Sequence, residues 1–175
     1  MLKSLALVVL AALVLLLIYA ATRPDTFRIE RSQRIQAPPE RVYGLINDLK
    51  GFNTWNPWRK KDPALKETYG SLSAGPGARY GWDSDKVGVG SMEITTVQSP
   101  SQVSLKLDFV KPFEAHNTVD FTLKAEGGGT QVTWAMQGPS PFMSKLMGVF
   151  VNMDRMVGQD FEDGLNTLKA LAEKP

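Results

Sequence analysis

An uncharged, strongly apolar segment near the N-terminus constrains this chain more than any other feature. No charged residue occurs from Leu5 to Ala21. As an α-helix with a rise of about 1.5 Å per residue, this segment would be about 25 Å long, slightly less than the roughly 30 Å hydrocarbon core of a bilayer. Tyr19 and the stems of Lys3 and Arg23 would extend its reach to both interfaces. We therefore expect residues 1–22 to form a single membrane-spanning anchor.

A cleaved secretory signal is the alternative explanation, because it also has a basic start and an apolar middle. Such a signal ends in small residues at the cleavage site, whereas cutting after Ala21 would place Tyr19 at the third position back, and cutting after Ala20 would place Ile18 there. The sequence therefore favours an uncleaved anchor. The side of the membrane stays open, because basic residues flank both ends of the segment and a chain without cysteine suits either compartment.

The charge balance excludes one class of partner. The chain has 20 Lys and Arg against 18 Asp and Glu, a net charge of +2, which is no electrostatic footprint for nucleic acid. Residues 26–175 have the size of one domain with a real core. The linker at 23–25 is too short to let that domain move far from the bilayer.

Alternating apolar and polar residues predict an antiparallel sheet. A strand over 27–37 stops at Pro38 and Pro39, where a short helix begins, because the fixed φ of proline suits a first helical turn. Further strands are expected at 78–84, 88–98, 102–110, 114–124 and 130–137. The short links between them require antiparallel neighbours.

The two best alternating strands show that the sheet has one apolar and one polar face. On the first of them, Val103, Leu105, Leu107 and Phe109 share a face, and the residues between them are polar. The second repeats the pattern, with these residues on one face: Phe113, Ala115, Asn117, Val119, Phe121 and Leu123.

A long amphipathic helix near the C-terminus supplies the cover for the apolar face. Apolar residues recur every three to four positions from Val149 to Ala172, with acidic and other polar residues on the remaining faces. The expected class is α+β, in which a curved antiparallel sheet wraps around one long C-terminal helix.

The order of these elements and their short motifs resembles a known superfamily. The motifs are Ala37-Pro38-Pro39-Glu40-Arg41-Val42 after the first strand, Trp55-Asn56-Pro57-Trp58, and Gly128-Gly129-Thr130-Gln131-Val132-Thr133-Trp134. Over residues 26–172 the chain is similar to the SRPBCC or START-like (birch-pollen-allergen-like) superfamily, above all to its bacterial polyketide cyclase/dehydrase-like members. The N-terminal anchor is a departure from most soluble members.

The resemblance implies a helix-grip fold with a deep apolar cavity between the sheet and the last helix. Members bind lipids, sterols, polyketides or hormones, and no catalytic set is shared, so no catalytic residue is carried over. The candidate lining residues are Leu105, Leu107, Phe109, Asn117, Val119, Phe121, Trp134, Met153, Val157 and Phe161. Phe52, Trp55 and Trp58 are candidates for a gate, although plain packing explains them equally well.

Charged side chains offer weaker candidates for chemistry. His116, the one histidine, falls on the polar face, and without cysteine no metal site is expected. Asp83, Asp85 and Glu93 could supply paired carboxylates, but Asp83-Ser84-Asp85 is first of all typical of a hairpin turn. Arg31 and Arg79 are expected at an edge with the head group in solvent, the alternative being an anchor for a ligand carboxylate. The basic run Arg59, Lys60 and Lys61 is either a solvated loop or a contact for anionic lipid head groups.

The leading hypothesis is therefore a membrane-anchored module that binds a hydrophobic small molecule or lipid without a cofactor. The methionines of the C-terminal third suit either an adaptable cavity or a plain core. The second hypothesis is a cyclase or dehydratase, which requires an ionisable side chain in the cavity. The third is a scaffold protein with a filled core.

Overall fold

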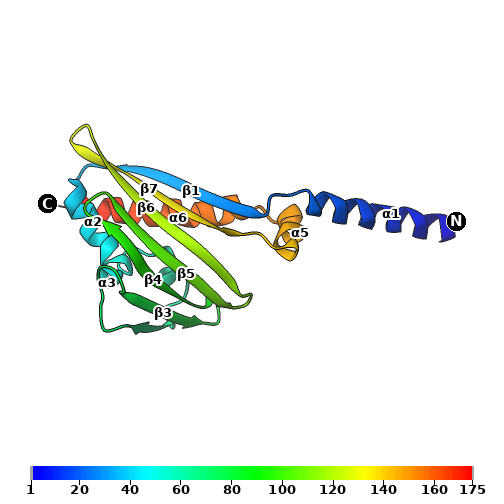
Figure 1. Ribbon diagram of the computed structural model, residues 1–175, viewed down its shortest axis with the longest axis horizontal. Coiled ribbons are helices and arrows are strands. Elements are labelled where there is room, and N and C mark those ends of the chain that lie inside the picture. The colour runs from blue at the N-terminus through cyan, green and yellow to red at the C-terminus, as the bar shows by residue number, and fades with distance from the viewer. Residues whose placement is uncertain (1, 175) are drawn as a thin grey trace.

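The computed structural model describes residues 2–174 as one sheet, a long helix packed against it, and an N-terminal helix that projects away (Figure 1). The helices are α1 (Leu2–Ala21), α2 (Pro39–Asn47), α3 (Leu49–Phe52), α4 (Pro57–Lys61), α5 (Phe142–Phe150) and α6 (Met153–Ala172). The strands are β1 (Thr26–Ile35), β2 (Lys66–Tyr69), β3 (Arg79–Ser84), β4 (Gly88–Gln98), β5 (Gln102–Lys111), β6 (Ala115–Glu126) and β7 (Gly129–Pro139).

The seven strands form one antiparallel sheet in the order β1-β7-β6-β5-β4-β3-β2. Consecutive strands from β2 to β7 are neighbours, as their short connections require. The first strand returns to pair with the last, with Ile29 opposite Met136 and Arg31 opposite Trp134. The predicted α+β helix-grip architecture is confirmed.

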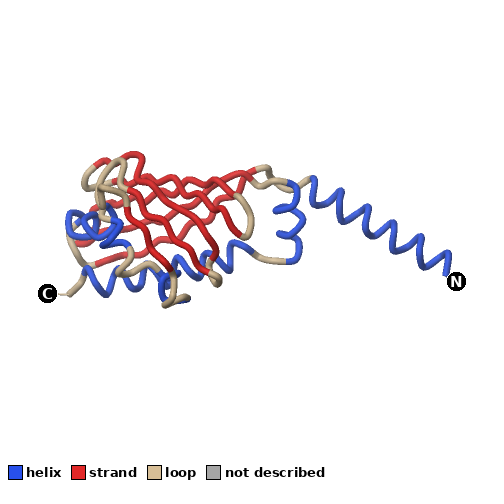
Figure 2. Tube along the Cα trace, turned by 90° about the horizontal axis from the view of Figure 1, so that it is seen from below, coloured by secondary structure: helices blue, strands red, loops and turns tan. Residues whose placement is uncertain are grey.

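The long helix α6 runs along the concave side of the sheet (Figure 2). Two glycines of α6 allow close approach, because a Cβ at Gly158 would lie 2.0 Å from Arg31 Nη2 and one at Gly164 would lie 2.9 Å from the Trp134 ring. Arg31 lies across the helix and forms ion pairs with Asp154 (3.1 Å) and Glu162 (2.8 Å). The close packing of helix on sheet therefore depends on these two positions.

Two local features differ from the sequence prediction. The predicted continuous helix is divided, because Val151 is extended and the Asn152 side chain accepts a hydrogen bond from Arg155 N, which caps a new helix. Val149 therefore belongs to α5. The edge strand β2 was not predicted, since its four residues, Lys66–Tyr69, carry no apolar alternation.

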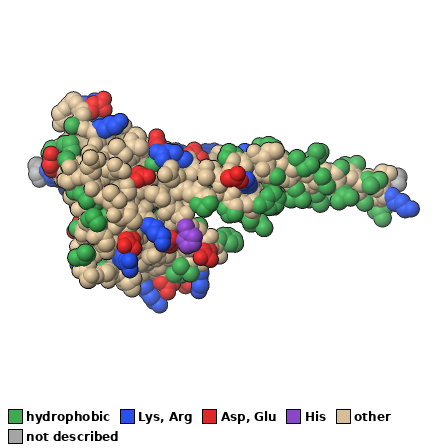
Figure 3. Space-filling view, viewed as in Figure 1, with side chains coloured by type: hydrophobic (Ala, Val, Ile, Leu, Met, Phe, Trp, Pro, Cys, Tyr) green, Lys and Arg blue, Asp and Glu red, His purple; other side chains and the backbone are tan. Residues whose placement is uncertain are grey.

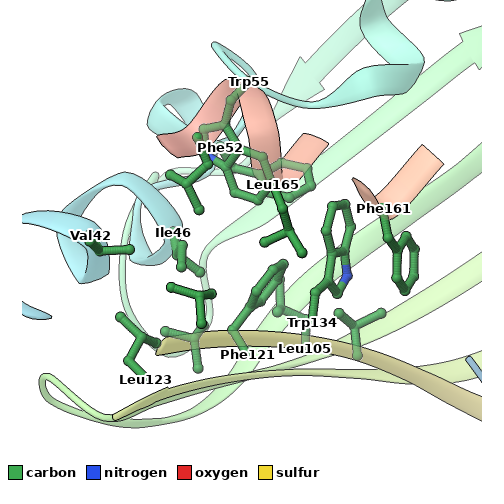
Figure 4. Close-up of a cluster of buried hydrophobic side chains, with 14 of the residues drawn as sticks. Val42, Ile46, Phe52, Trp55, Leu105, Phe121, Leu123, Trp134, Phe161 and Leu165 are labelled. Carbon is green, nitrogen blue, oxygen red and sulfur yellow. The ribbon is translucent and has the colours of Figure 1, made fainter. Parts of the chain in front are cut away.

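The interior is tightly filled where α2 and α3 cover the sheet beside the C-terminal half of α6. Ile46, Leu49, Leu165 and Leu168 are at most 1% exposed. Figure 4 shows these helices and strands contributing side chains to one cluster, which includes Val42 and Leu123. This end of the domain is a conventional hydrophobic core.

Helix α1 lies beyond the opposite end of the domain and packs against α5 (Figures 1 and 2). Its residues are solvent-exposed or half-buried except Ala20, which is fully buried and lies in the last turn of the helix. The Arg23 guanidinium lies over the Tyr19 ring, 5.9 Å from its centroid. By length and composition, α1 is a helix that can cross a membrane.

Candidate functional site

An apolar cavity of about 150 Å³ lies between the sheet and the N-terminal half of α6. Strands β3 to β7 supply most of its wall, the helices α3, α4 and α6 supply a further part, and connecting segments supply Asn56, Leu65 and Val87. The wall consists of Phe52, Asn56, Trp58, Leu65, Tyr80, Trp82, Val87, Met92, Leu105, Leu107, Phe109, Val119, Phe121, Trp134, Met136, Val157 and Phe161. An apolar cavity of this volume is large enough to hold an aromatic ring the size of benzene.

Most of the predicted lining residues come together on this wall. They are Leu105, Leu107, Phe109, Val119, Phe121, Trp134, Val157 and Phe161. Asn117 does not line the cavity: it is buried against Gly138, where a Cβ would lie 2.0 Å from its Oδ1. Met153 is also off the wall, because it lies in the first turn of α6 and is 46% exposed.

The predicted gate residues have different positions. Trp55 is fully buried, its Nε1 donates to the Leu45 carbonyl oxygen at 2.9 Å, and it does not line the cavity. Phe52 lines the cavity but is only 2% exposed, and its ring packs edge-on against Trp55 at 4.7 Å. Trp58 is half-buried and on the wall. Trp58 is therefore the member of this group whose position suits a movable wall.

Trp134 is the central side chain of the site. Its ring stacks on Phe161 with a centroid distance of 4.1 Å and an interplanar angle of 6°, and it contacts Phe121 at 5.0 Å (Figure 4). Gly164 leaves the room for it to approach α6. The Trp134 Nε1–H is buried and has no hydrogen-bond acceptor among the described protein atoms. A buried donor without an acceptor costs about 1–3 kcal/mol, so an acceptor that reached this N–H after a small rearrangement of the wall would recover that cost.

The other polar groups of the wall already have partners. Asn56 accepts a hydrogen bond from Trp58 N and donates to Asn53 Oδ1, both at 3.0 Å. The Tyr80 hydroxyl donates to Glu67 Oε1 at 3.3 Å. Burial, followed by the nearby Glu67 carboxylate, raises the pKa of the Tyr80 phenol well above its usual value. Among the described residues, Tyr80 is the only ionisable side chain on the wall, and it stays protonated at neutral pH.

The turn between β3 and β4 carries Val87 to the wall. Asp62 Oδ2 accepts a hydrogen bond from Ser84 Oγ at 2.6 Å. Ser84 Oγ itself accepts hydrogen bonds from Lys86 N and Val87 N, each at 3.1 Å. The Ser84 hydroxyl, and then the Ala64 backbone N–H, lower the pKa of Asp62. The residues around Ser84 thus form a structured turn, as the sequence indicated.

Several wall residues were not identified from the sequence. Tyr80 and Trp82 alternate on β3, and Met136 follows Trp134 with the same period on β7, so a period-two pattern was available for them. Leu65 lies between α4 and β2, and Val87 lies in the turn between β3 and β4, where no periodicity applies. Their part in the wall depends on tertiary packing alone.

The remaining charged candidates lie away from the cavity. The His116 side chain is 62% exposed, and its Nδ1 lies 2.6 Å from Asp108 Oδ1; this hydrogen bond raises the pKa of His116. Arg79 pairs with Glu93 at 3.0 Å and is also exposed. Among residues 2–174, no cluster of three or more His, Asp and Glu side chains has a geometry that could hold a metal ion.

The three basic side chains of α4 are exposed, and each has a polar partner within the protein. Arg59 pairs with Glu67 at 3.4 Å, and Lys61 pairs with Asp160 at 2.6 Å. Lys60 Nζ donates to Thr167 Oγ1 at 3.1 Å. Contact of these three residues with lipid head groups stays a prediction, and it would have to compete with these intramolecular partners.

A family model described as "Polyketide cyclase / dehydrase and lipid transport" matches residues 26–173. The fold is similar to protein MLL2253 from Mesorhizobium loti (17% identity, 83% of this chain and 96% of that chain covered, TM-score 0.62). It is also similar to protein CV1439 from Chromobacterium violaceum (17% identity, 87% of this chain and 100% of that chain covered, TM-score 0.62). A third similar structure is that of Ara h 8.0201 (12% identity, 84% of this chain and 96% of that chain covered, TM-score 0.58). No curated protein matches the chain significantly. At these identities the structural neighbours establish the fold alone.

Proposed function

Because the chain belongs to the polyketide cyclase/dehydrase and lipid-transport family, within the SRPBCC superfamily, we propose that it is a membrane-anchored protein that binds a hydrophobic small molecule or lipid in its cavity. The observation that carries the proposal is the apolar cavity of about 150 Å³, whose wall includes Trp134, a side chain with a buried Nε1–H that has no acceptor among the described residues. Apolar area removed from water drives binding, at about 25 cal/mol per Å². A guest with an acceptor is oriented by a hydrogen bond to Trp134 Nε1, which it reaches by displacing the side chains that cover this N–H.

The size of the cavity limits what enters without rearrangement. Ligand sites for drug-sized molecules usually have volumes of about 300–1,000 Å³, so this cavity fits one ring or a short stretch of hydrocarbon chain. Met92 and Met136 lie on the wall, and their unbranched, flexible side chains repack readily. Trp58 and Val157 are only half-buried. A larger guest therefore enters by displacing these four side chains.

Binding without catalysis is favoured over a cyclase or dehydratase reaction. Both reactions need a group that accepts or delivers a proton at the guest. Within the described chain, the wall offers the Tyr80 phenol, whose raised pKa makes it a hydrogen-bond donor and a poor base. The filled-core scaffold is disfavoured by the cavity itself.

Helix α1 supports the membrane part of the proposal. Its length of 20 residues corresponds to about 30 Å, the thickness of the hydrocarbon core. Arg23 and Tyr19 at its C-terminal end are residue types enriched at the interface. The intact mass of the protein extracted from membranes tests this: a mass that includes residues 1–22 supports the anchor, and a mature chain that begins after them identifies a cleaved signal.

Quenching of tryptophan fluorescence tests the binding function. Trp58, Trp82 and Trp134 line the cavity, so an iodinated guest such as iodobenzene should quench their emission saturably. The Val157→Phe variant, whose larger side chain occupies the cavity, is the control for quenching by iodobenzene that is dissolved in the detergent and does not enter the cavity. Saturable quenching in the wild type that is lost in Val157→Phe supports the proposal, and equal, non-saturable quenching in both contradicts it.

A further inference from the structure

Most of the large apolar side chains that are exposed outside α1 lie on α5 and at the start of α6. Within the described range 142–150, no residue of α5 is buried. Met143, Met147 and Phe150 are 63%, 52% and 71% exposed, and their spacing of four and three residues places them on one face of the helix. Met153 and Met156, which follow on α6, are 46% and 52% exposed. Large apolar side chains gathered in this way mark an interaction surface.

The neighbours of α5 indicate what covers this surface. Helix α5 packs against α1 beside the C-terminal turn of α1, where Ala20 is buried. The Lys145 ammonium, the one charge on α5, forms an ion pair with Asp25 in the linker, and Ser140 N donates to the Asp25 carbonyl oxygen at 2.6 Å. In Figure 3 the hydrophobic surface of α1 continues onto this end of the domain. The contacts thus hold α5 at the level where α1 would leave the bilayer.

We propose that the exposed face of α5 (Met143, Met147 and Phe150) lies in the interface of the lipid bilayer, as a second membrane contact beside α1. This inference rests on the membrane anchor of the proposed function. An amphipathic helix in that position buries its apolar face at the boundary between head groups and acyl chains. Contact with the bilayer removes from water three large side chains that the described protein leaves exposed.

The position of α5 also determines which side of the cavity lies toward the bilayer. Met153, Val157 and Phe161 are spaced four residues apart, so they form one strip along α6. Phe161 is buried on the cavity wall, Val157 is half-buried on the wall, and Met153 is exposed beside α5. With α5 in the interface, this apolar strip leads from the cavity to the bilayer. The bilayer is therefore the source from which an apolar guest is taken.

The contact is apolar and not electrostatic. The Lys145 charge is paired with Asp25, and Arg59 and Lys61 of α4 are paired with Glu67 and Asp160, whereas Lys60 donates to a hydroxyl. At about 1 M salt the Debye length falls to about 3 Å, which removes most attraction between exposed charges and head groups. The proposed contact should persist under these conditions, whereas a contact made by Arg59, Lys60 and Lys61 would be weakened.

Single labelled cysteines test the proposal, because the chain contains no cysteine of its own. An environment-sensitive nitrobenzoxadiazole label is attached in turn to Leu10→Cys, Met147→Cys and Leu72→Cys of the full chain in phosphatidylcholine vesicles. Leu10 reports on the anchor. Leu72 is the matched control, since it is 52% exposed like Met147 but lies in the loop after β2 beside α3, at the far end of the domain (Figure 1).

The account predicts that nitroxide lipids labelled near the head group quench the label at position 147, that deeply labelled lipids quench the label at position 10, and that neither quenches the label at position 72. Quenching at position 147 should persist at 1 M salt. Quenching at position 10 without quenching at position 147 overturns the α5 contact and leaves the anchor intact. Loss of quenching at both positions overturns both. Cross-linking between copies through position 147 without lipid quenching overturns the contact in favour of a dimer.

Discussion

The two ends of the space between sheet and helix are packed in opposite ways. At the end covered by α2 and α3, the side chains of Ile46, Leu165 and Leu168 interlock and are at most 1% exposed. Toward α5, the same sheet and helix enclose an apolar cavity of about 150 Å³. The two ends share one sheet and one helix, and they differ in the short helices that fill the first end. The first end therefore stabilises the fold, and the second is available for binding.

The largest expected effect compares a leucine at each end. Leu168→Ala should lower the free energy of unfolding by about 3–5 kcal/mol, because it opens a new void in a filled core. Leu107→Ala, at the cavity wall, should cost only about 2 kcal/mol, since the space beside it is already empty. Chemical denaturation of the full chain in detergent measures both. Equal costs would contradict the contrast between the ends.

Replacing a small side chain by a larger one at each end gives a second comparison of the cavity with the filled core. Val157→Phe fills the cavity, and it should weaken binding of a small aromatic guest at least about tenfold without loss of stability. Val42→Phe adds the same volume to the filled end, where the side chain is fully buried, and should cost about 1–3 kcal/mol. Guest titrations and unfolding curves of the two variants are compared. A Val157→Phe protein that binds as well as the wild type would show that guests lie elsewhere.

A smaller effect is expected from removing the indole N–H. Trp134→Phe keeps an aromatic ring but loses the buried donor, so affinity for benzaldehyde should fall about two- to tenfold. Affinity for toluene, which has no acceptor, measures the change in shape alone and should fall less. Trp58→Phe, on the same wall, is the control. Equal losses for both guests would show that Trp134 contributes shape and not a hydrogen bond.

The smallest expected effect is a pH dependence of stability that arises from His116, on the exposed face of the sheet, and not from the face that lines the cavity. The hydrogen bond to Asp108 raises the pKa of His116 in the folded state. The resulting stabilisation is fully present below the unfolded pKa of about 6.5 and is lost as pH rises through the higher folded pKa. It should be slight, because the side chain is 62% exposed, and His116→Gln should abolish it.

Guest affinity should stay constant over the same pH range. The cavity is on the other face of the sheet, and Tyr80, the ionisable residue found on its described wall, does not titrate there. Titrations of a neutral guest between about pH 6 and pH 8 check this expectation. A change in affinity that follows the titration of His116 would mean that the two faces are coupled.

The sequence predicted the sheet and its apolar face because both depend on local periodicity. Leu105 and Phe121 alternate with polar neighbours, so their face could be read directly. Which of the inward-facing residues meet a cavity could not be predicted, as Trp55 shows. It lies in the same short segment as Trp58, but its ring packs behind the wall residues Phe52 and Trp134 and does not line the cavity.

Capping and packing explain the other differences. The break between α5 and α6 depends on one side chain, Asn152, within an otherwise continuous apolar pattern. The close approach of Trp134 to α6 depends on the absence of a side chain at Gly164. Neither feature changes the hydrophobic periodicity, so neither could be predicted from it. The exposed face of α5 was not predicted either, since Met143 and Met147 were interpreted as side chains of a core or of an adaptable cavity.

The most direct test of the central claim is to identify what the protein carries. The full chain is purified from its native membranes, extracted with organic solvent and analysed by mass spectrometry, beside the Val157→Phe variant. An apolar molecule should be enriched with the wild type and depleted with the variant. A wild-type protein that carries no such molecule and also excludes added aromatic guests would contradict it.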